Sequence, residues 1–197
     1  KTEHDDFSED HILKKRLKHY PNLDFTPGDR YQYSNLSYAI LGKTLEIASG
    51  NSLEQLLNIH IRKPLGIGKN ELSFIYNQKS NYAKGYLKKW SFMNLFKQFV
   101  VDDKFFGEYE DNWLRIQPHH VDFKAMGGLF SNAQTLALVL QDLVKDQSRL
   151  LNDTSKSLLS CAVLSNDGED LPMTLGWHVK RKQGQYYFYK EGGGAGY

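Results

Sequence analysis

The sequence of 197 residues contains one cysteine, Cys161. A single cysteine excludes an internal disulfide and any metal site built from several thiolates. It does not determine the compartment, because exported proteins can also lack disulfides.

Long apolar runs are also absent. The longest, Leu136 to Leu140, is far shorter than the roughly 20 residues of a membrane-spanning helix. Charges nearly cancel, since 25 basic minus 23 acidic side chains gives +2. The basic residues are scattered, apart from a short cluster near Lys14 to Lys18. We therefore expect no membrane span and no nucleic-acid partner.

Complete catalytic motifs are missing as well. The chain has no Gly-x-Ser-x-Gly, no Ser-x-x-Lys, no phosphate-binding loop and no His-Glu-x-x-His. His119-His120 with Asp122 is a weak metal candidate, because adjacent residues rarely face one ion and no zinc spacing is met. The expectation is no metal and no organic cofactor.

What is present is an ordinary globular composition, with 40% hydrophobic and 24% charged residues. Apolar spacing and capping signals predict helices first and strands last. The expected helices are 9–18, 35–49 ending at Gly50, 53–61 with a Ser52/Gln55 capping box and a break at Pro64-Leu65-Gly66, 133–145 opened by Ser131 and Gln134, and 152–161.

The remaining segments are read differently. Residues 173–190 predict a hairpin that turns at Gln183-Gly184. Residues 72–90 are weakly strand-like, and residues 91–126 have no clear period and predict a loop-rich excursion. Pro27-Gly28 predicts a turn directly ahead of the second helix.

Several short motifs follow one another in a fixed order. They are Phe25-x-Pro27-Gly28-x-x-Tyr31-x-Tyr33-Ser34-Asn35-x-x-Tyr38-x-x-Leu41-Gly42, Glu46, Ser49-Gly50, Pro64-Leu65-Gly66, Gly127-Gly128-Leu129-x-Ser131, Leu150-Leu151, Leu175-Gly176-Trp177 and Lys190-Glu191-Gly192 with Gly193, Gly194 and Gly196. Each motif is weak alone. As a set covering residues 20–197, they resemble the serine β-lactamase and penicillin-binding-protein superfamily, closest to class C β-lactamases and their esterase and D,D-peptidase relatives.

The resemblance implies an α+β fold with a mostly helical subdomain and an antiparallel sheet subdomain. Residues 1–165 would form part of the first, and residues 172–197 would begin the second. The chain would then be an internal piece that needs flanking segments of the same polypeptide to complete the fold. The resemblance also suggests a periplasmic or otherwise exported protein.

The resemblance further implies acyl transfer through a serine ester, with the nucleophile of a Ser-x-x-Lys motif outside this chain. Tyr33 would relay the serine proton, because positive charge from Lys190 and from the motif lysine would favour its phenolate. Asn35 would hydrogen-bond the motif lysine or a substrate amide. The backbone N–H of Gly193 would donate to the oxyanion.

Glu191 departs from the family pattern, which has Thr or Ser between the lysine and Gly192. A carboxylate facing the cleft would repel anionic substrates and favour a neutral ester or amide over a β-lactam. Alternation along the strand would instead turn Glu191 to solvent. Both orientations stay open from sequence.

The predicted function is a serine hydrolase acting on a small-molecule or peptide substrate. The alternatives are a non-catalytic binding protein on the same scaffold and an unrelated helical interaction module. A Ser-x-x-Lys in the full-length sequence separates the first two. Separation of Tyr33 from Lys190 to opposite sides of the molecule would favour the third.

Overall fold

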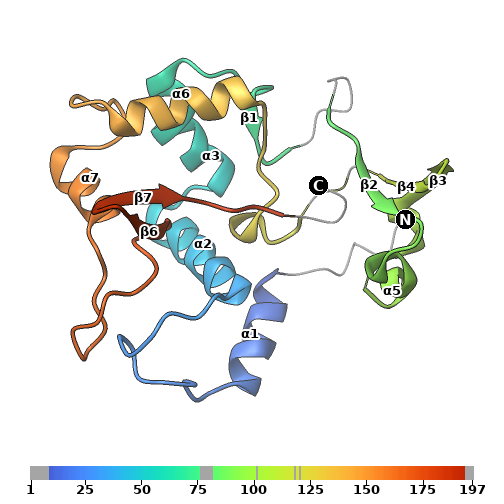
Figure 1. Ribbon diagram of the computed structural model, residues 1–197, viewed down its shortest axis with the longest axis horizontal. Helices are drawn as coiled ribbons and strands as arrows, with labels where there is room; N and C mark the ends of the chain where they lie inside the picture. Colours follow the sequence, from blue (N-terminus) through green and yellow to red (C-terminus); the bar gives the residue numbers. More distant parts are fainter. Residues whose placement is uncertain (1–8, 76–81, 101, 118, 120, 194–197) are drawn as a thin grey trace.

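The computed structural model describes residues 9–75, 82–100, 102–117, 119 and 121–193. A helical body occupies one side and a small sheet unit the other, with the C-terminal hairpin lying across the body (Figure 1). The longer helices of the body are α1 (Glu9–His19), α2 (Asn35–Ser49), α6 (Ala133–Val144) and α7 (Asp153–Ser160). Within the described residues, no helix has both the length and the apolar character needed to cross a membrane.

The boundaries of α2 match the sequence prediction. The Ser34 side chain accepts a hydrogen bond from the Ser37 N–H at the N-terminus. Gly50 ends the helix with a φ of 67°, and its N–H donates to the Glu46 carbonyl. Glycine fits there because a left-handed residue carries a steric cost for any side chain with a Cβ.

The predicted break at Pro64-Leu65-Gly66 is confirmed at its last residue, although the helix runs on past residue 61. The capping box of Ser52 and Gln55 opens α3 (Leu53–Leu57) as expected, but the helix continues through a π-helical turn, η2 (Asn58–Arg62), into α4 (Lys63–Leu65) and ends at Gly66. Proline cannot donate to the carbonyl four residues earlier and its ring crowds that carbonyl. A wider turn just before Pro64 relieves both problems, so the chain stays helical.

An ion pair within this helical segment, Arg62 with Glu54, also hydrogen-bonds the short strand β1 (Leu72–Ser73), which pairs with β5 (Phe130–Ser131). Arg62 Nη1 lies 2.7 Å from Glu54 Oε1 and also donates to the Leu72 carbonyl at 3.1 Å. Beside it, Leu57, Ile67 and Leu72 form the local core. Losing Glu54 would leave the Arg62 charge buried without its carboxylate, whereas Glu54 would keep the Ser73 hydroxyl and the Phe74 N–H as donors.

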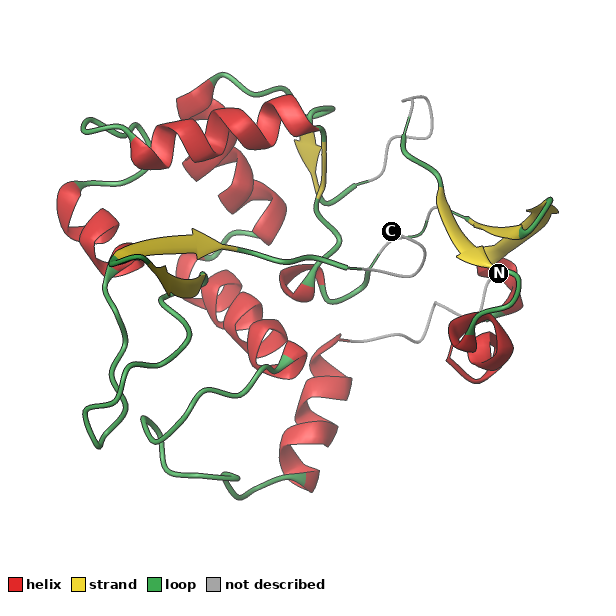
Figure 2. Ribbon diagram, viewed as in Figure 1, coloured by secondary structure: helices red, strands yellow, loops and turns green. Residues whose placement is uncertain are grey.

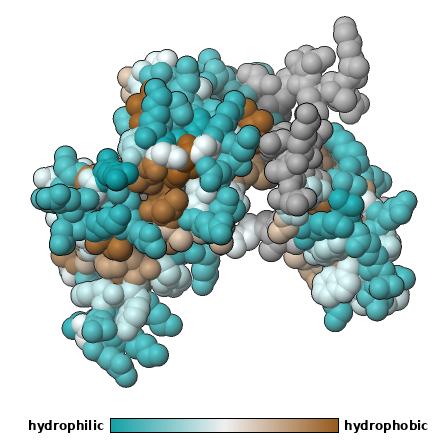
Figure 3. All heavy atoms as spheres, turned by 90° about the horizontal axis from the view of Figure 1, so that it is seen from above, coloured by the Kyte–Doolittle hydropathy of each residue, from teal (hydrophilic) through white to brown (hydrophobic). Residues whose placement is uncertain are grey.

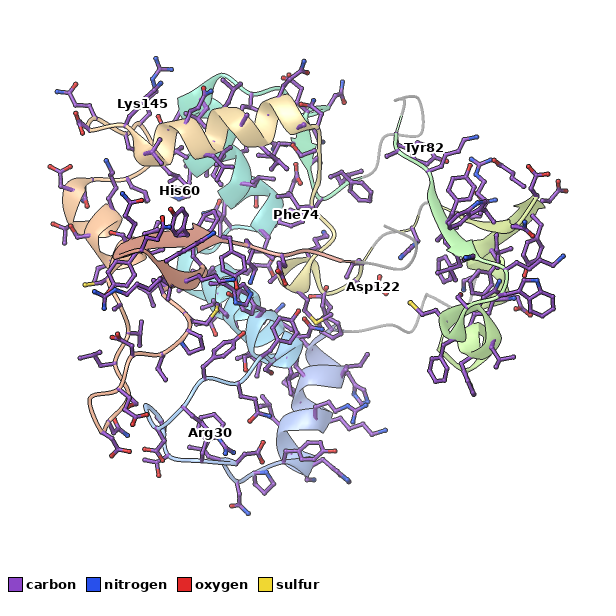
Figure 4. All side chains as sticks on the ribbon, in the orientation of Figure 1. Arg30, His60, Phe74, Tyr82, Asp122 and Lys145 are labelled. Carbon is purple, nitrogen blue, oxygen red and sulfur yellow. The ribbon has the colours of Figure 1, made fainter. Side chains whose placement is uncertain are left out.

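The loop-rich excursion predicted over residues 91–126 is also wrong. The chain there forms α5 (Phe92–Val100), η3 (Asp103–Phe105), β3 (Phe106–Glu110), β4 (Trp113–Ile116) and η4 (Lys124–Met126). With β2 (Gly85–Lys88), these strands make an antiparallel sheet in the order β2-β4-β3. Its core is Leu87, Leu114 and Ile116. Arg115 Nη2 donates to the Tyr82 hydroxyl at 3.0 Å at the edge of this unit (Figure 4).

Helix α6 begins differently from the prediction. Its N-cap is Asn132, whose side chain accepts from the Thr135 N–H, whereas the Ser131 hydroxyl donates to the Glu71 carbonyl at 2.9 Å. Thr135 and Asp142 are the buried residues of the helix, and Leu136, Leu138 and Leu140 are about half exposed. Figure 3 shows apolar atoms on the exposed face of the helical body.

The C-terminal hairpin is confirmed. It pairs β6 (His178–Lys182) with β7 (Gln185–Tyr189), from His178 opposite Tyr189 to Lys182 opposite Gln185 (Figure 2). Both turn residues have positive φ, 51° at Gln183 and 79° at Gly184, as a two-residue turn of this hand requires. The division of the chain at residues 165–172 stays a prediction.

Candidate active site

The turn that leads into α2 is held from a distant part of the sequence. The Asp29 N–H donates to the Thr26 carbonyl at 3.1 Å, and Gly28 has a φ of 93°. Asn166 closes on this turn, since its N–H donates to the Gly28 carbonyl at 2.9 Å and its Nδ2 donates to the Pro27 carbonyl at 3.1 Å. A Cβ on Gly28 would lie 2.4 Å from Asn166 Oδ1, so this close approach requires glycine. The segment that carries Tyr33 is therefore anchored at its start.

Tyr33 and Asn35 flank the N-cap of α2. The Tyr33 hydroxyl donates to Asn35 Oδ1 at 2.8 Å, which links the two predicted site residues directly. The Tyr33 ring is 61% exposed, so its hydroxyl can reach a group that approaches from solvent. Because Ser34 between them caps the helix, the two side chains are displayed from a fixed backbone.

Lys190 follows directly after β7 and contacts α2, the helix that begins at Asn35. Its Nζ lies 5.8 Å from the ring centroid of Tyr38, which is one turn into α2. This contact brings Lys190, and with it the start of the Lys190-Glu191-Gly192 segment, to the N-terminal half of α2. Tyr38 follows Tyr33 and Asn35 closely in the sequence. Within the described residues no direct hydrogen bond joins Tyr33 and Lys190, and their predicted approach through one water stays a prediction.

The residues after Lys190 are open to solvent. Glu191, Gly192 and Gly193 are exposed, and a Cβ on Gly192 or Gly193 would meet nothing within 4 Å. The last residues of the glycine-rich run, 194–197, lie outside the described part of the chain. The roles predicted for Glu191, Gly192 and Gly193 therefore stay predictions.

Tyr38 is the residue that the sequence analysis gave no role. Tyr38 belongs to the ordered motif, but a sequence pattern does not show which side chain will lie beside a lysine 152 positions later. The signal available was its helical spacing, because Tyr38 lies four residues after the N-cap Ser34 and its N–H donates to the Ser34 carbonyl. That spacing puts it on the same end of α2 as the Tyr33-Asn35 pair.

The histidine pair considered as a metal site is represented in the described residues by His119, which contacts protein groups. His119 Nδ1 lies 3.1 Å from the Gln117 carbonyl oxygen, and its ring meets Phe105 edge-on at 5.1 Å. Asp122 is exposed on the following segment (Figure 4), and His120 lies outside the described residues. In the described ranges, no three His, Cys, Asp or Glu side chains gather as a metal site would need.

A small polar cavity lies on another face of α2. It has a volume of about 50 Å³, with Glu9, Lys43, Glu46 and Lys124 among its lining residues. Burial raises the pKa of Glu9, and the neighbouring Glu46 carboxylate adds to this rise. Lys43 is bound to Asp10 at 2.9 Å. The volume suits one or two waters rather than an organic substrate, so the cavity belongs to the packing of α1 on α2.

Comparison with known proteins gives a match along almost the whole chain. A family model described as beta-lactamase matches residues 3–197. Two curated Dichelobacter nodosus proteins, named as FimD fimbrial assembly proteins of serogroups D and H1, are 32% and 31% identical over 78 residues. These matches cover 36% of this chain and 20% of each relative, so the chain aligns with only about a fifth of their length.

Two solved structures share the fold. The octameric penicillin-binding protein homologue from Pyrococcus abyssi superposes with a TM-score of 0.63 at 20% identity, over 88% of this chain and 36% of that one. Simvastatin synthase (LovD) from Aspergillus terreus superposes with a TM-score of 0.51 at 21% identity, over 80% of this chain and 38% of that one. At such identities the likeness concerns the fold alone.

Proposed function

The chain belongs to the beta-lactamase family, with the α+β fold of β-lactamases and penicillin-binding proteins, and we propose that it forms part of a serine hydrolase that works through an acyl-serine intermediate. The observation that carries the proposal is the contact of Lys190 with Tyr38. It brings Lys190, just after the end of β7, to the helix that begins at Asn35 and is preceded by Tyr33 and the N-cap Ser34. Two motifs that are far apart in the sequence thus share one end of α2.

In the proposed reaction, a serine from a Ser-x-x-Lys segment outside this chain attacks the carbonyl carbon of the substrate. Tyr33, ionised to the phenolate, would receive the serine proton and pass it to the leaving group as the bond from the carbonyl carbon to that group breaks. A free tyrosine has a pKa of about 10, so this role requires positive charge nearby. Lys190 and the lysine of the Ser-x-x-Lys segment would supply that charge. Water then hydrolyses the acyl-serine by the reverse proton path.

The neighbouring groups would bind the substrate rather than move protons. The Gly193 N–H would donate to the oxygen that becomes negative in the tetrahedral intermediate, and the open space at Gly193 leaves room for a substrate. Asn35 Oδ1 already accepts from Tyr33, which leaves its amide N–H₂ to donate to a substrate carbonyl. Gly192 would allow the substrate to approach the strand closely.

Glu191 would decide between substrate classes. It adds a negative charge next to Lys190, and it is exposed on the segment proposed to line the cleft. A carboxylate there opposes an anionic substrate such as a β-lactam and tolerates a neutral ester or amide. We therefore propose an ester or amide as the preferred substrate.

Further segments of the same polypeptide are part of the proposal. The outer face of α6 and the strand β7 leave large apolar side chains 40–50% exposed, among them Leu138, Tyr186 and Tyr189. Apolar surface of this extent usually packs against another element. The proposed flanking segments would cover it and would carry the nucleophile.

The test compares residues 1–197 with the full-length protein, using a nitrophenyl ester and a chromogenic cephalosporin. We expect turnover only from the full-length protein, because loss of the nucleophile in such a unit removes several orders of magnitude of rate. Mass spectrometry of the trapped protein should place the acyl group on the serine of Ser-x-x-Lys. A stoichiometric acyl adduct on a serine within residues 1–197 would contradict the proposed site, and an inert full-length protein would indicate a binding protein instead.

A further inference from the structure

Helix α5 packs with its polar side toward the protein. Asn94 is only 5% exposed and lies against the sheet unit. Its Nδ2 donates to the carbonyls of Lys88 and Lys89 at 3.3 and 3.1 Å, and its Oδ1 accepts from Lys97 Nζ at 2.6 Å. Tyr109 on β3 completes this polar contact through its hydroxyl, 3.0 Å from Asn94 Nδ2. The orientation of the helix is therefore fixed by hydrogen bonds on its inner side.

The opposite side of α5 and Trp90, two residues before the helix, are apolar and face solvent. We call Trp90, Phe92, Met93 and Leu95 the α5 apolar face; they are 84%, 77%, 59% and 74% exposed. The Phe92 ring also contacts Phe96, with centroids 4.5 Å apart. An amphipathic helix in a soluble domain normally buries its apolar side, so this inverted arrangement exposes a surface suited to an apolar environment.

Exposed lysines lie at the N-terminal end of this surface. From Leu72 to Val101 the sequence has lysines at 79, 84, 88, 89 and 97 and no aspartate or glutamate, whereas Asp102 and Asp103 follow at the C-terminal end of the helix. Lys88 and Lys89 are exposed and directly precede Trp90. On the sheet, Glu110 of β3 accepts from the Tyr86 hydroxyl at 2.7 Å and lies 3.9 Å from Lys84.

We propose that the α5 apolar face binds the surface of an anionic phospholipid bilayer. Trp and Phe side chains partition into the interfacial layer of a membrane, and lysines beside them contact anionic headgroups. The helix has both features, and it lies at the edge of the sheet unit, away from the helical body (Figure 1). The helix would lie in the plane of the interface, because nine residues are far too few to span a bilayer.

The test is co-sedimentation of the full-length protein with vesicles of phosphatidylcholine alone or mixed with phosphatidylglycerol. The wild-type protein should sediment with the mixed vesicles. High salt should release it, because salt screens the attraction between the lysines and the anionic headgroups. Phe92→Ser with Leu95→Ser should lower the partition coefficient more than about tenfold, since two large apolar groups no longer enter the interface. Lys88→Glu with Lys89→Glu should lower it by about tenfold or more on mixed vesicles only.

Val144→Ser is the matched control, because Val144 on α6 is 81% exposed and lies outside the α5 apolar face. It should bind vesicles like wild type, and circular dichroism should show that all variants keep the native spectrum. Failure of wild type to sediment with the mixed vesicles would overturn the proposal. A second contradictory result is a wild-type dimer in sedimentation velocity that is lost in Phe92→Ser/Leu95→Ser, together with no binding of wild type to vesicles. The α5 apolar face would then bind a second copy of the chain.

Discussion

Asp142 shows how one buried carboxylate organises the end of a helix. It is 2% exposed, near the C-terminus of α6, and accepts hydrogen bonds from the Ser148 hydroxyl and the N–H groups of Arg149 and Leu150. Burial alone would raise the pKa of this carboxyl, but these hydrogen bonds outweigh it and hold the pKa below its usual value.

Replacing Asp142 by Asn should therefore destabilise the protein in a pH-dependent way. A lowered folded-state pKa adds stability above the unfolded value of about 3.9, and this contribution is lost as the pH falls through the folded pKa. We expect Asp142→Asn to lower the free energy of unfolding by about 1.5–3 kcal/mol at pH 7 and by clearly less at pH 3. Urea unfolding at both pH values measures this, with the exposed Asp146→Asn as control. An equal loss at both pH values would show that the charge is not involved.

Glu191 tests the proposed substrate preference. In the full-length enzyme, Glu191→Thr should raise kcat/KM for a cephalosporin relative to a short-chain nitrophenyl ester by roughly ten- to a hundredfold, because it removes a negative charge and restores a hydroxyl. The ratio should respond less at high salt, where charges are screened. An unchanged ratio would place Glu191 outside the cleft and restore the β-lactam as an equal candidate.

Tyr38 offers a separate test of how Lys190 is held. The ring lies 5.8 Å from Lys190 Nζ and is 38% exposed, a setting in which a cation–π contact contributes about 0.5–1 kcal/mol. Tyr38→Leu should lower kcat/KM about two- to fivefold, whereas Tyr38→Phe keeps the ring and should stay close to wild type. Equal losses in the two variants would point to the Tyr38 hydroxyl rather than to its ring.

At the scale of elements, Gly42 controls how η4 packs on α2. A Cβ at Gly42 would lie 2.3 Å from the Ala125 Cβ, closer than any tolerable contact. We expect Gly42→Ala to lower the free energy of unfolding by about 1–3 kcal/mol through overpacking. Gly127→Ala is the control, because a Cβ there meets nothing within 4 Å at an extended φ of 169°. Thermal or urea unfolding of both variants measures the difference. Similar small losses of unfolding free energy in the two variants would mean that η4 shifts easily to make room for the added methyl group.

The sequence predicted the elements whose ends are set locally. Gly50 and Ser52 lie beside the helices that they cap, and Gln183-Gly184 lies within its own hairpin, so neighbouring residues suffice to identify them. Elements that depend on distant partners were predicted weakly or missed. Strand β2 lies in the segment 72–90 that was predicted to be weakly strand-like, whereas its partner β4 was missed. The two pair from Gly85 opposite Ile116 to Lys88 opposite Trp113, and strands this short leave no clear period.

The two errors at helix ends have a similar physical cause. Ser131 looked like a cap for α6, but its hydroxyl donates to Glu71, a residue 60 positions earlier, and the adjacent Asn132 caps instead. The helix predicted to stop at residue 61 continues through a π-helical turn and ends at Gly66, while Arg62 is held by the partly buried Glu54. In both cases tertiary contacts override a local preference.

At the scale of the whole molecule, the fold and the family agree with what the ordered motifs implied. The sequence could name Tyr33, Asn35 and Lys190 because each belongs to a recognisable motif. It could not give Tyr38 its place beside Lys190, which depends on the path of the hairpin back to α2. The central claim is therefore that Tyr33 and Lys190 act in one site of an acyl-serine hydrolase.

A double-mutant cycle in the full-length enzyme tests this claim most directly. Tyr33→Phe and Lys190→Ala should each lower kcat/KM for the preferred ester by about a hundredfold or more, since both take part in one proton transfer. The double variant should then be within about tenfold of the worse single variant, as expected for residues that work as a unit. Losses that multiply to their full product, or single variants that keep wild-type activity, would contradict a shared site.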